Sequence, residues 1–295
     1  MVKVTAWHRI VAVTGIVAFG LSSLSVQAQL PVTHMVDADG GTMRVRSAGL
    51  ESRRPDQPIL VMEAGAGATL ETWDVAFPEL ARLGPIIAYD RRGHGQSQAD
   101  TIVPTLKRDI ESLHALLKTL AAPPPYVLVG HSWGGVIVRG FAHSYPAEVV
   151  GLVYLDVPDF ESTREEKAAV LPPEDRRRAL EPPTFPPIPP DTPPGLRAAM
   201  EQLMIETRND YPTARAFKQP TGIPAAVVVT TRADRLEGNG GPIVRLHIKK
   251  QQEWALSSPN GLFVLAGHSG HQVQRNDPAL IVQLVSHVLK HARLR

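Results

Sequence analysis

The sequence contains no cysteine among its 295 residues. This absence excludes disulfide bonds, a lipid-modified N-terminal cysteine, and metal or redox chemistry that depends on thiol groups. The sequence also lacks a P-loop, a dinucleotide-binding glycine fingerprint and any spacing typical of metal ligands. We therefore expect neither a metal ion nor a cofactor.

The sequence also has no large excess of positively or negatively charged residues. Lysine and arginine number 31 against 29 aspartate and glutamate, which gives a formal net charge of +2. The three arginines at 176–178 stand among prolines and acidic residues, as on a solvated surface. Nucleic acid is therefore not an expected partner. With 43% hydrophobic and 20% charged residues, the composition is that of a globular protein with one large core.

The N-terminal segment has the pattern of a secretory signal peptide. Lys3 and Arg9 supply positive charge, residues 10–24 form an apolar run, and residues 26–28 (Val-Gln-Ala) offer small side chains for a signal peptidase. We expect residues 1–28 to be removed before Gln29, and a bacterial protein that is periplasmic or secreted, without a stable membrane partner. The alternative is an uncleaved membrane anchor, because the apolar run is near the lower limit for spanning a bilayer.

Residues 130–134 read Gly-His-Ser-Trp-Gly and lie between an apolar run at 126–129 and a helix-compatible stretch at 135–142. In this context the G-x-S-x-G pattern predicts a strand that turns directly into a helix, with Ser132 at the tip in a strained conformation. The flanking glycines are needed because a Cβ there would collide with the neighbouring backbone. The pattern predicts a nucleophilic serine near a helix N-terminus.

Three further segments each combine an apolar strand with a tight turn, at 58–67, 85–97 and 262–271. The order of these motifs resembles that of the α/β-hydrolase family, over about residues 40–156 and 222–292. The resemblance implies an α/β fold with a mostly parallel central sheet flanked by helices. It also implies an active site at the carboxyl ends of the strands.

The chain is expected to be organised as core, insertion and core. Hydrophobic periodicity predicts an edge strand at 42–48, helices at 105–120 and 196–207, and strands at 149–155 and 225–230. Prolines are dense over 158–195 and are incompatible with a central strand or a helix interior. The resemblance implies a lid or cap here. We assign the core to 29–156 and 222–295, and a Pro-rich lid insertion to 157–221.

A serine nucleophile needs a base, and the base needs an orienting carboxylate. His271 and His268 are the two candidate bases. The resemblance to the α/β-hydrolase family implies a loop that reads Gly-His, in which the proline that starts the last helix follows seven residues after the histidine. Gly270, His271 and Pro278 fit this spacing, so His271 is favoured. His131, next to the nucleophile, is expected to point its side chain elsewhere.

Two aspartates compete for the role of acid. In the commonest family arrangement the acid follows the penultimate strand, where this chain has Asp234 without the usual glycine. In a variation within the fold the acid ends the preceding strand, where this chain has Asp156 directly after Leu155. Asp234 could instead pair with a neighbouring arginine on the surface. We favour Asp156 and keep Asp234 as the alternative.

The oxyanion of acyl transfer needs two N–H donors. We expect the backbone N–H of Trp133 to supply one. The family motif His-Gly-x-Gly corresponds here to residues 64–67 (Ala-Gly-Ala-Gly), so Ala66 takes the second donor position. Glu63 is interpreted as a buried structural group, with contact to the substrate as the alternative. The loop at 90–97 resembles a family landmark that scaffolds the site.

The predicted function is that of a serine hydrolase acting on a small-molecule carboxylic ester, thioester or lactone. The resemblance implies that epoxide hydrolases and haloalkane dehalogenases of this fold have aspartate at the position of Ser132. The serine therefore argues against both of these activities. Cofactor-free perhydrolysis or C–C cleavage by the same triad is the alternative within the fold. A non-catalytic binding protein of this fold is the alternative from another class.

Overall fold

The computed structural model describes residues 30–99, 105–209, 211–231, 236–237 and 240–292. The expected signal peptide and Asp234 lie outside the described residues. Within the described part, no helix is both long and apolar enough to cross a membrane.

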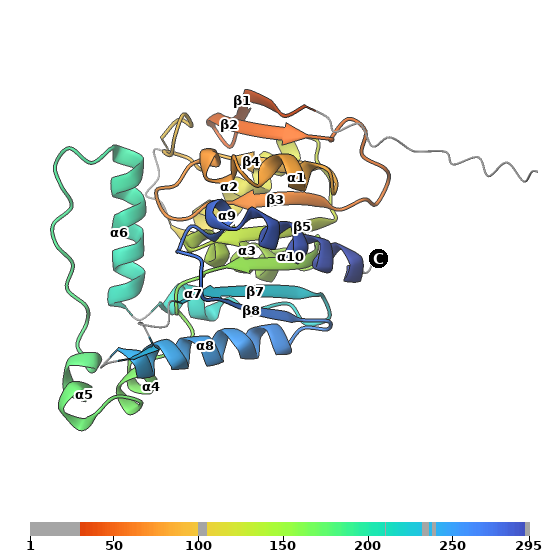
Figure 1. Ribbon diagram of the computed structural model, residues 1–295. Coiled ribbons are helices and arrows are strands. Elements are labelled where there is room, and N and C mark those ends of the chain that lie inside the picture. The colour runs from red at the N-terminus through yellow and green to blue at the C-terminus, as the bar shows by residue number, and fades with distance from the viewer. Residues whose placement is uncertain (1–29, 100–104, 210, 232–235, 238–239, 293–295) are drawn as a thin grey trace, which may run out of the picture.

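One eight-stranded sheet forms the centre of the molecule (Figure 1). Its spatial order is β1-β2-β4-β3-β5-β6-β7-β8. The strands are β1 (Val32–Ala38), β2 (Gly41–Ala48), β3 (Ile59–Glu63), β4 (Ile86–Tyr89), β5 (Tyr126–His131), β6 (Val149–Leu155), β7 (Ala225–Thr230) and β8 (Leu262–Ala266). β2 pairs antiparallel with both β1 and β4, and the pairs from β4 to β8 are parallel. The predicted α/β fold with a mostly parallel sheet is confirmed.

Helices cover both faces of this sheet. They are the 3₁₀ helix η1 (Leu70–Trp73) and the α-helices α1 (Phe77–Ala81), α2 (Leu106–Thr119), α3 (Trp133–Ser144), α4 (Arg164–Ala169), α5 (Pro173–Leu180), α6 (Pro194–Arg208), α7 (Pro212–Ala216), α8 (Gly241–Leu256), α9 (Val273–Asn276) and α10 (Pro278–His291). One buried cluster joins the sheet to α2, α3 and α8, and a second joins it to η1, α1 and α10. Alternate residues of β3 and β5 enter opposite clusters, so both faces of these central strands are buried.

The prediction of an edge strand at 42–48 is wrong, because β2 lies between β1 and β4. The edge is β1, which pairs with β2 along its whole length from Val32 opposite Ser47 to Ala38 opposite Gly41. β1 gives little signal in the sequence because five of its seven residues are exposed, apolar side chains of Val32 and Met35 among them. Only Ala38, at the end of β1, is buried, so the strand lacks the alternation of buried and exposed residues that identifies strands.

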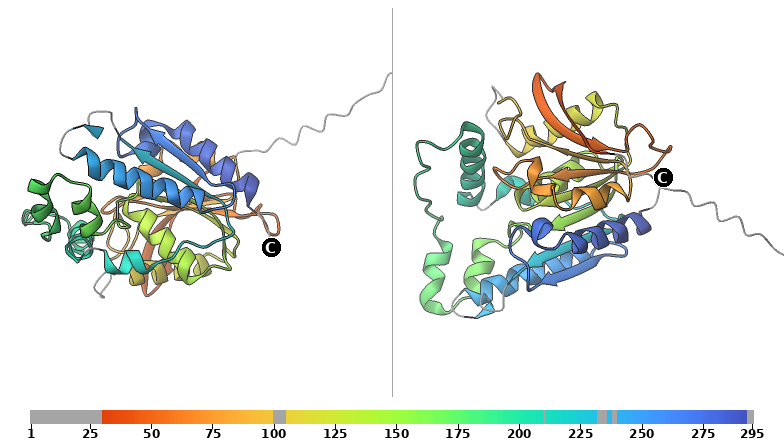
Figure 2. Two further views of the ribbon diagram at one scale, coloured as in Figure 1. Left: turned by 90° about the horizontal axis from the view of Figure 1, so that it is seen from below. Right: turned by 45° about the horizontal axis from the view of Figure 1, so that its top comes forward.

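Four helices and a long irregular segment lie between β6 and β7. The prolines do not interrupt these helices: Pro173 and Pro194 begin α5 and α6, where a missing N–H costs nothing. Residues 182–193, between α5 and α6, form neither helix nor strand. α4, α5 and α6 lie beyond one end of the sheet (Figures 1 and 2), whereas Ala214 of α7 is part of the buried core.

The N-terminus of α6 covers loops at the carboxyl ends of two strands. A Cβ on Gly67, after β3, would lie 2.1 Å from Leu196 Cδ1. A Cβ on Gly195 would lie 1.3 Å from the backbone oxygen of Gly93, after β4. The backbones of Gly195 and Gly93 approach so closely that position 195 requires glycine. Within the segment between β6 and β7, α6 is therefore packed against loops at the carboxyl ends of β3 and β4.

Candidate active site

Ser132 occupies a sharp turn between β5 and α3. Its backbone has φ 51° and ψ −124°, a conformation that side-chain-bearing residues adopt only when their surroundings impose it. A Cβ on Gly130 would lie 2.6 Å from the backbone oxygen of Gly134, and a Cβ on Gly134 would lie 2.3 Å from that of Glu63. The backbone N–H of Ser132 donates to the Leu155 carbonyl at 2.8 Å. The strained turn is thus fixed by backbone packing, and the two glycines make that packing possible.

His271 and Asp156 form a close pair. Nδ1 of His271 lies 2.6 Å from Oδ2 of Asp156, and Oδ1 of Asp156 accepts from the backbone N–H of Thr230 at 2.7 Å. Burial raises the pKa of Asp156, but the hydrogen bonds from His271 and Thr230 outweigh burial, so this pKa lies below its usual value. Asp156 is therefore an ionised acceptor that keeps the Nδ1 proton of His271 in place and leaves Nε2 free of it.

Ser132, Asp156 and His271 line one cavity of about 230 Å³. Its other walls come from the segment after β6, the end of β7, and α8. The structure thus brings together the predicted nucleophile, base and favoured acid from three segments separated in sequence. His268 is exposed in the turn after β8 and does not line this cavity.

The predicted oxyanion donors flank Ser132. Trp133 is the first residue of α3, where backbone N–H groups have no partner within the helix. A Cβ on Gly65 would lie 3.3 Å from Cβ of Ser132, so the segment containing Ala66 runs beside the nucleophile. The N-terminal end of α3, where the helix dipole is positive, and this loop are therefore both adjacent to Ser132.

Arg91 holds the oxyanion loop from behind. Its guanidinium donates to the carbonyls of Ala64 at 2.5 Å and Gly65 at 2.6 Å, and also to Glu63 Oε1 at 2.5 Å. Tyr89 donates to the other oxygen of the Glu63 carboxylate. Glu63 is fully buried and does not line the cavity of Ser132. It therefore has a structural role, because it neutralises the arginine that positions the loop.

The loop at 90–97 is cross-linked to its surroundings. Asp90 is fully buried, and its carboxylate accepts from the backbone N–H of Leu70 at 2.7 Å and of Gln96 at 3.0 Å. His94 Nδ1 donates to the Arg92 carbonyl at 3.1 Å. Burial, aided by the charge of Arg91, lowers the pKa of His94 to about 3, so the ring is neutral. These contacts scaffold the segment after β4.

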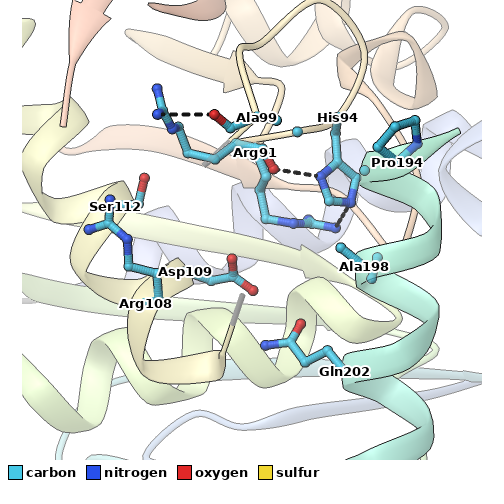
Figure 3. A pocket seen from close by; sticks show the side chains of 13 residues that line it. Arg91, His94, Ala99, Arg108, Asp109, Ser112, Pro194, Ala198 and Gln202 are labelled. Carbon is cyan, nitrogen blue, oxygen red and sulfur yellow. Dashed lines mark hydrogen bonds between the residues drawn. The ribbon is translucent and has the colours of Figure 1, made fainter. Parts of the chain in front are cut away.

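A second cavity, of about 160 Å³, lies between α2, this loop and α6 (Figure 3). Arg91, His94, Asp109 and Gln202 contribute polar groups to its walls, and the side chains of Asp109 and Gln202 point toward each other. Burial raises the pKa of Asp109 to about 6, although Arg91 opposes the shift. Gln202 also accepts from Nε1 of Trp133 at 3.4 Å, which links α6 to the start of α3.

The expectation that His131 points away from the site is wrong. The ring lies against that of His271, with centroids 4.8 Å apart, and its Nε2 is 2.7 Å from the His271 carbonyl oxygen. Burial, the largest effect, lowers the pKa of His131 to about 4. The reason is strand alternation: His131 lies on the same face of β5 as Val127 and Val129, which pack in the buried cluster that contains Val273 of α9.

Sequence reasoning missed His247, which lines the cavity of Ser132 from α8. No motif surrounds it. A signal exists nonetheless: His247 follows Val244 by three residues and precedes Trp254 by seven, which places all three on one face of a helix. Among the described residues, no group of three or more histidine, aspartate or glutamate side chains could hold a metal ion.

Comparisons with known proteins agree with this architecture. A sequence profile of the Alpha/beta hydrolase family matches residues 60–284. The protein YqjL of Bacillus subtilis is 35% identical over 97 residues, which cover 33% of this chain and 38% of that protein. Protein phosphatase methylesterase 1 of Gibberella zeae is 36% identical over 114 residues, covering 34% of this chain and 28% of that protein. The chain thus spans little more than a third of these relatives at most.

Among solved structures, epoxide hydrolase CorEH superposes with a TM-score of 0.61 at 17% sequence identity. The superposition covers 88% of this chain and 99% of that one. At this identity the likeness establishes the shared fold and not a shared substrate.

Proposed function

Because the chain belongs to the alpha/beta hydrolase family, we propose that it is a serine hydrolase that cleaves a carboxylic ester through an acyl-enzyme intermediate. The family and the fold support hydrolase activity. The observation that carries the narrower proposal is a serine at the strained turn after β5, in one cavity with a histidine paired to a half-buried aspartate.

The chemistry follows from the positions of these groups. Ser132 Oγ attacks the ester carbonyl while His271 Nε2 takes its proton, and Asp156 stabilises the imidazolium that forms. The N–H groups of Trp133 and Ala66 stabilise the oxyanion. The alkoxide leaving group takes the proton from His271. Water, deprotonated by the same histidine, then attacks the acyl-enzyme, and Ser132 recovers its proton.

The residue at the elbow argues against the neighbouring chemistries. Epoxide hydrolase CorEH shares the fold. The family resemblance implies, however, that epoxide hydrolases of this fold have aspartate at the position that Ser132 occupies in this chain. Protein phosphatase methylesterase 1 is by its name an esterase and is consistent with acyl transfer. Thioesters and lactones fit the same mechanism. Perhydrolysis or C–C cleavage by the same groups, and a binding protein without activity, are the competing hypotheses.

Two further proposals concern the segments outside the core. Residues 157–221 act as a cap, which is supported by the contact of α6 with the loops after β3 and β4.

Residues 1–28 direct export, which is supported by their charge and apolar run alone. N-terminal sequencing of protein exported by a bacterial host should begin at or next to Gln29, whereas intact Met1 in the membrane fraction would indicate an anchor.

The test of the proposed activity is hydrolysis of p-nitrophenyl esters with acyl chains of two to eight carbons. Wild-type protein should turn over at least one of them, and Ser132→Ala should lose at least about a thousandfold in kcat. Ser269→Ala is the matched control, because it removes a buried serine hydroxyl from the loop of His271 that has no partner among the described residues. Equal activity of Ser132→Ala and Ser269→Ala would refute the proposal.

A further inference from the structure

His247 is a second histidine in the cavity of Ser132. It projects from α8 and lines the same space as Ser132, Asp156 and His271. Its side chain is 17% exposed, and it takes no part in the acyl-transfer steps given above. A group that shares this space with the nucleophile contacts whatever substrate fills the cavity.

The surroundings of His247 keep its ring neutral. Burial lowers its pKa, while the carboxylates of Asp159 and Asp156 oppose the shift and Lys167 adds to it. Lys167 Nζ lies 3.4 Å from Asp159 Oδ2, so the nearer carboxylate is already paired with a cation. A neutral imidazole has one donor and one acceptor nitrogen.

The two ring nitrogens face different environments. Nδ1 is buried and lies 3.9 Å from Asp159 Oδ1, too far for a hydrogen bond, and it has no other partner among the described residues. The carboxylate on that side favours the tautomer with its proton on Nδ1, because an N–H dipole pointing at a negative charge lowers the energy. Nε2 is then the acceptor and is the nitrogen left for the cavity.

The remaining walls of the cavity restrict what can reach Nε2. They are mainly apolar, with two threonines at the end of β7: Val157, Pro158, Val229, Val244, Thr230 and Thr231. Asp156 lies in the same wall as an ionised carboxylate and repels an anionic substrate. A small, uncharged chain carrying one hydrogen-bond donor matches these surfaces.

We propose that His247 is a substrate-contacting specificity residue that accepts a hydrogen bond from a hydroxyl group close to the scissile carbonyl. The substrate class is therefore a small, uncharged hydroxy ester, with the hydroxyl on either the acyl or the alcohol part. This inference rests on the proposed ester hydrolysis and narrows its substrate. Replacing the hydroxyl by methyl leaves Nε2 desolvated and unpaired, which disfavours the alkyl analogue.

The experiment compares pairs of esters that differ only in hydroxyl against methyl. The acyl pair is p-nitrophenyl 3-hydroxybutanoate and 3-methylbutanoate, and the alcohol pair is 2-hydroxypropyl acetate and isobutyl acetate. In at least one pair the wild-type protein should prefer the hydroxy ester by about tenfold to a hundredfold in kcat/KM. His247→Leu should bring that ratio to about one, mainly by slowing the hydroxy ester. His247→Gln should retain part of the preference because its side-chain oxygen accepts a hydrogen bond.

The outcomes separate the two proposals. Turnover of all four esters with ratios near one in the wild-type protein, or ratios that His247→Leu leaves unchanged, would overturn the role of His247 and leave the serine mechanism intact. Loss of the preference in His247→Gln as complete as in His247→Leu would also contradict it. If His247→Leu fails to fold, the wild-type and His247→Gln ratios decide. No turnover of any ester would refute both proposals.

Discussion

His131 Nε2 lies 2.7 Å from the backbone carbonyl oxygen of His271. A carbonyl only accepts, so Nε2 carries the proton and donates it, and the ring is the Nε2–H tautomer. His131 ends β5 beside the nucleophile, and His271 stands in the loop after β8. The hydrogen bond therefore ties the loop that carries the proposed base to the strand that carries the proposed nucleophile. His131 is a positioning residue, acting through the backbone of His271.

The first prediction is that kcat depends on the hydrogen bond that His131 donates to the His271 carbonyl, more than on the imidazole ring itself. His131→Gln can place its amide N–H near the position of Nε2, whereas His131→Leu removes the donor and leaves the His271 carbonyl without it. We expect kcat to fall about tenfold to a hundredfold in His131→Leu with little change in KM, and His131→Gln to recover most of the loss. Equal kcat in both variants, at wild-type level, would contradict the positioning role.

The second prediction distinguishes the two histidines of the loop after β8. His271 is paired with Asp156, whereas the side chain of His268 is exposed and outside the cavity. His271→Ala should reduce ester turnover by at least about a thousandfold, because the serine loses its base. His268→Ala should change kcat/KM less than about fivefold. The reverse order of effects, measured under identical conditions, would assign the base to His268.

The third prediction concerns the orienting acid. Asp156→Asn keeps the shape of the side chain but permits the wrong tautomer of His271, so kcat should fall by several orders of magnitude with a modest change in KM. Asp234→Asn, at the alternative position, should cost less than about tenfold. A crippled Asp234→Asn with a nearly normal Asp156→Asn would mean that the acid follows β7. Melting curves of both variants must match for the comparison to hold.

The fourth prediction uses the pKa of Asp109, which burial raises from 3.8 to about 6. The folded state therefore binds this proton more tightly than the unfolded state, and the stability that the proton contributes is lost as pH rises from about 4 through 6. Asp109→Asn does not titrate. Its free energy of unfolding relative to wild type should rise by about 2 kcal/mol between pH 4 and pH 8.

The control for Asp109 is Asp191→Asn, an exposed aspartate in the Pro-rich segment. Its free energy of unfolding relative to wild type should be nearly the same at both pH values. Chemical denaturation at pH 4, 6 and 8 measures both variants. A pH-independent difference for Asp109→Asn would mean that this carboxylate has an ordinary pKa in the folded protein.

Much of the fold was predictable because the buried parallel strands are short apolar runs bounded by turns. The elbow around Ser132 was predictable for a similar reason, since only glycine permits its backbone contacts. His271 and Asp156 were nominated by their positions in loops at strand ends. At each of these places the local sequence pattern and the tertiary structure favour the same type of residue.

The remainder depends on contacts that no local pattern records. β1 pairs with β2 along its whole length although only one of its own residues, Ala38, is buried. The contact of the His131 ring with His271 depends on the loop after β8 packing beside the end of β5, and the environment of His247 depends on α8 packing beside the end of β6. The tertiary structure decides such orientations, while the sequence only restricts the residue types.

The fifth prediction tests the central claim that Ser132 is a nucleophile activated by His271. A fluorophosphonate probe should label the wild-type protein with one adduct, and peptide mapping by mass spectrometry should locate that adduct on Ser132. His271→Ala should be labelled at least about a hundredfold more slowly, and Ser132→Ala not at all. Adduct on another residue, or labelling of Ser132→Ala at the wild-type rate, would contradict the account.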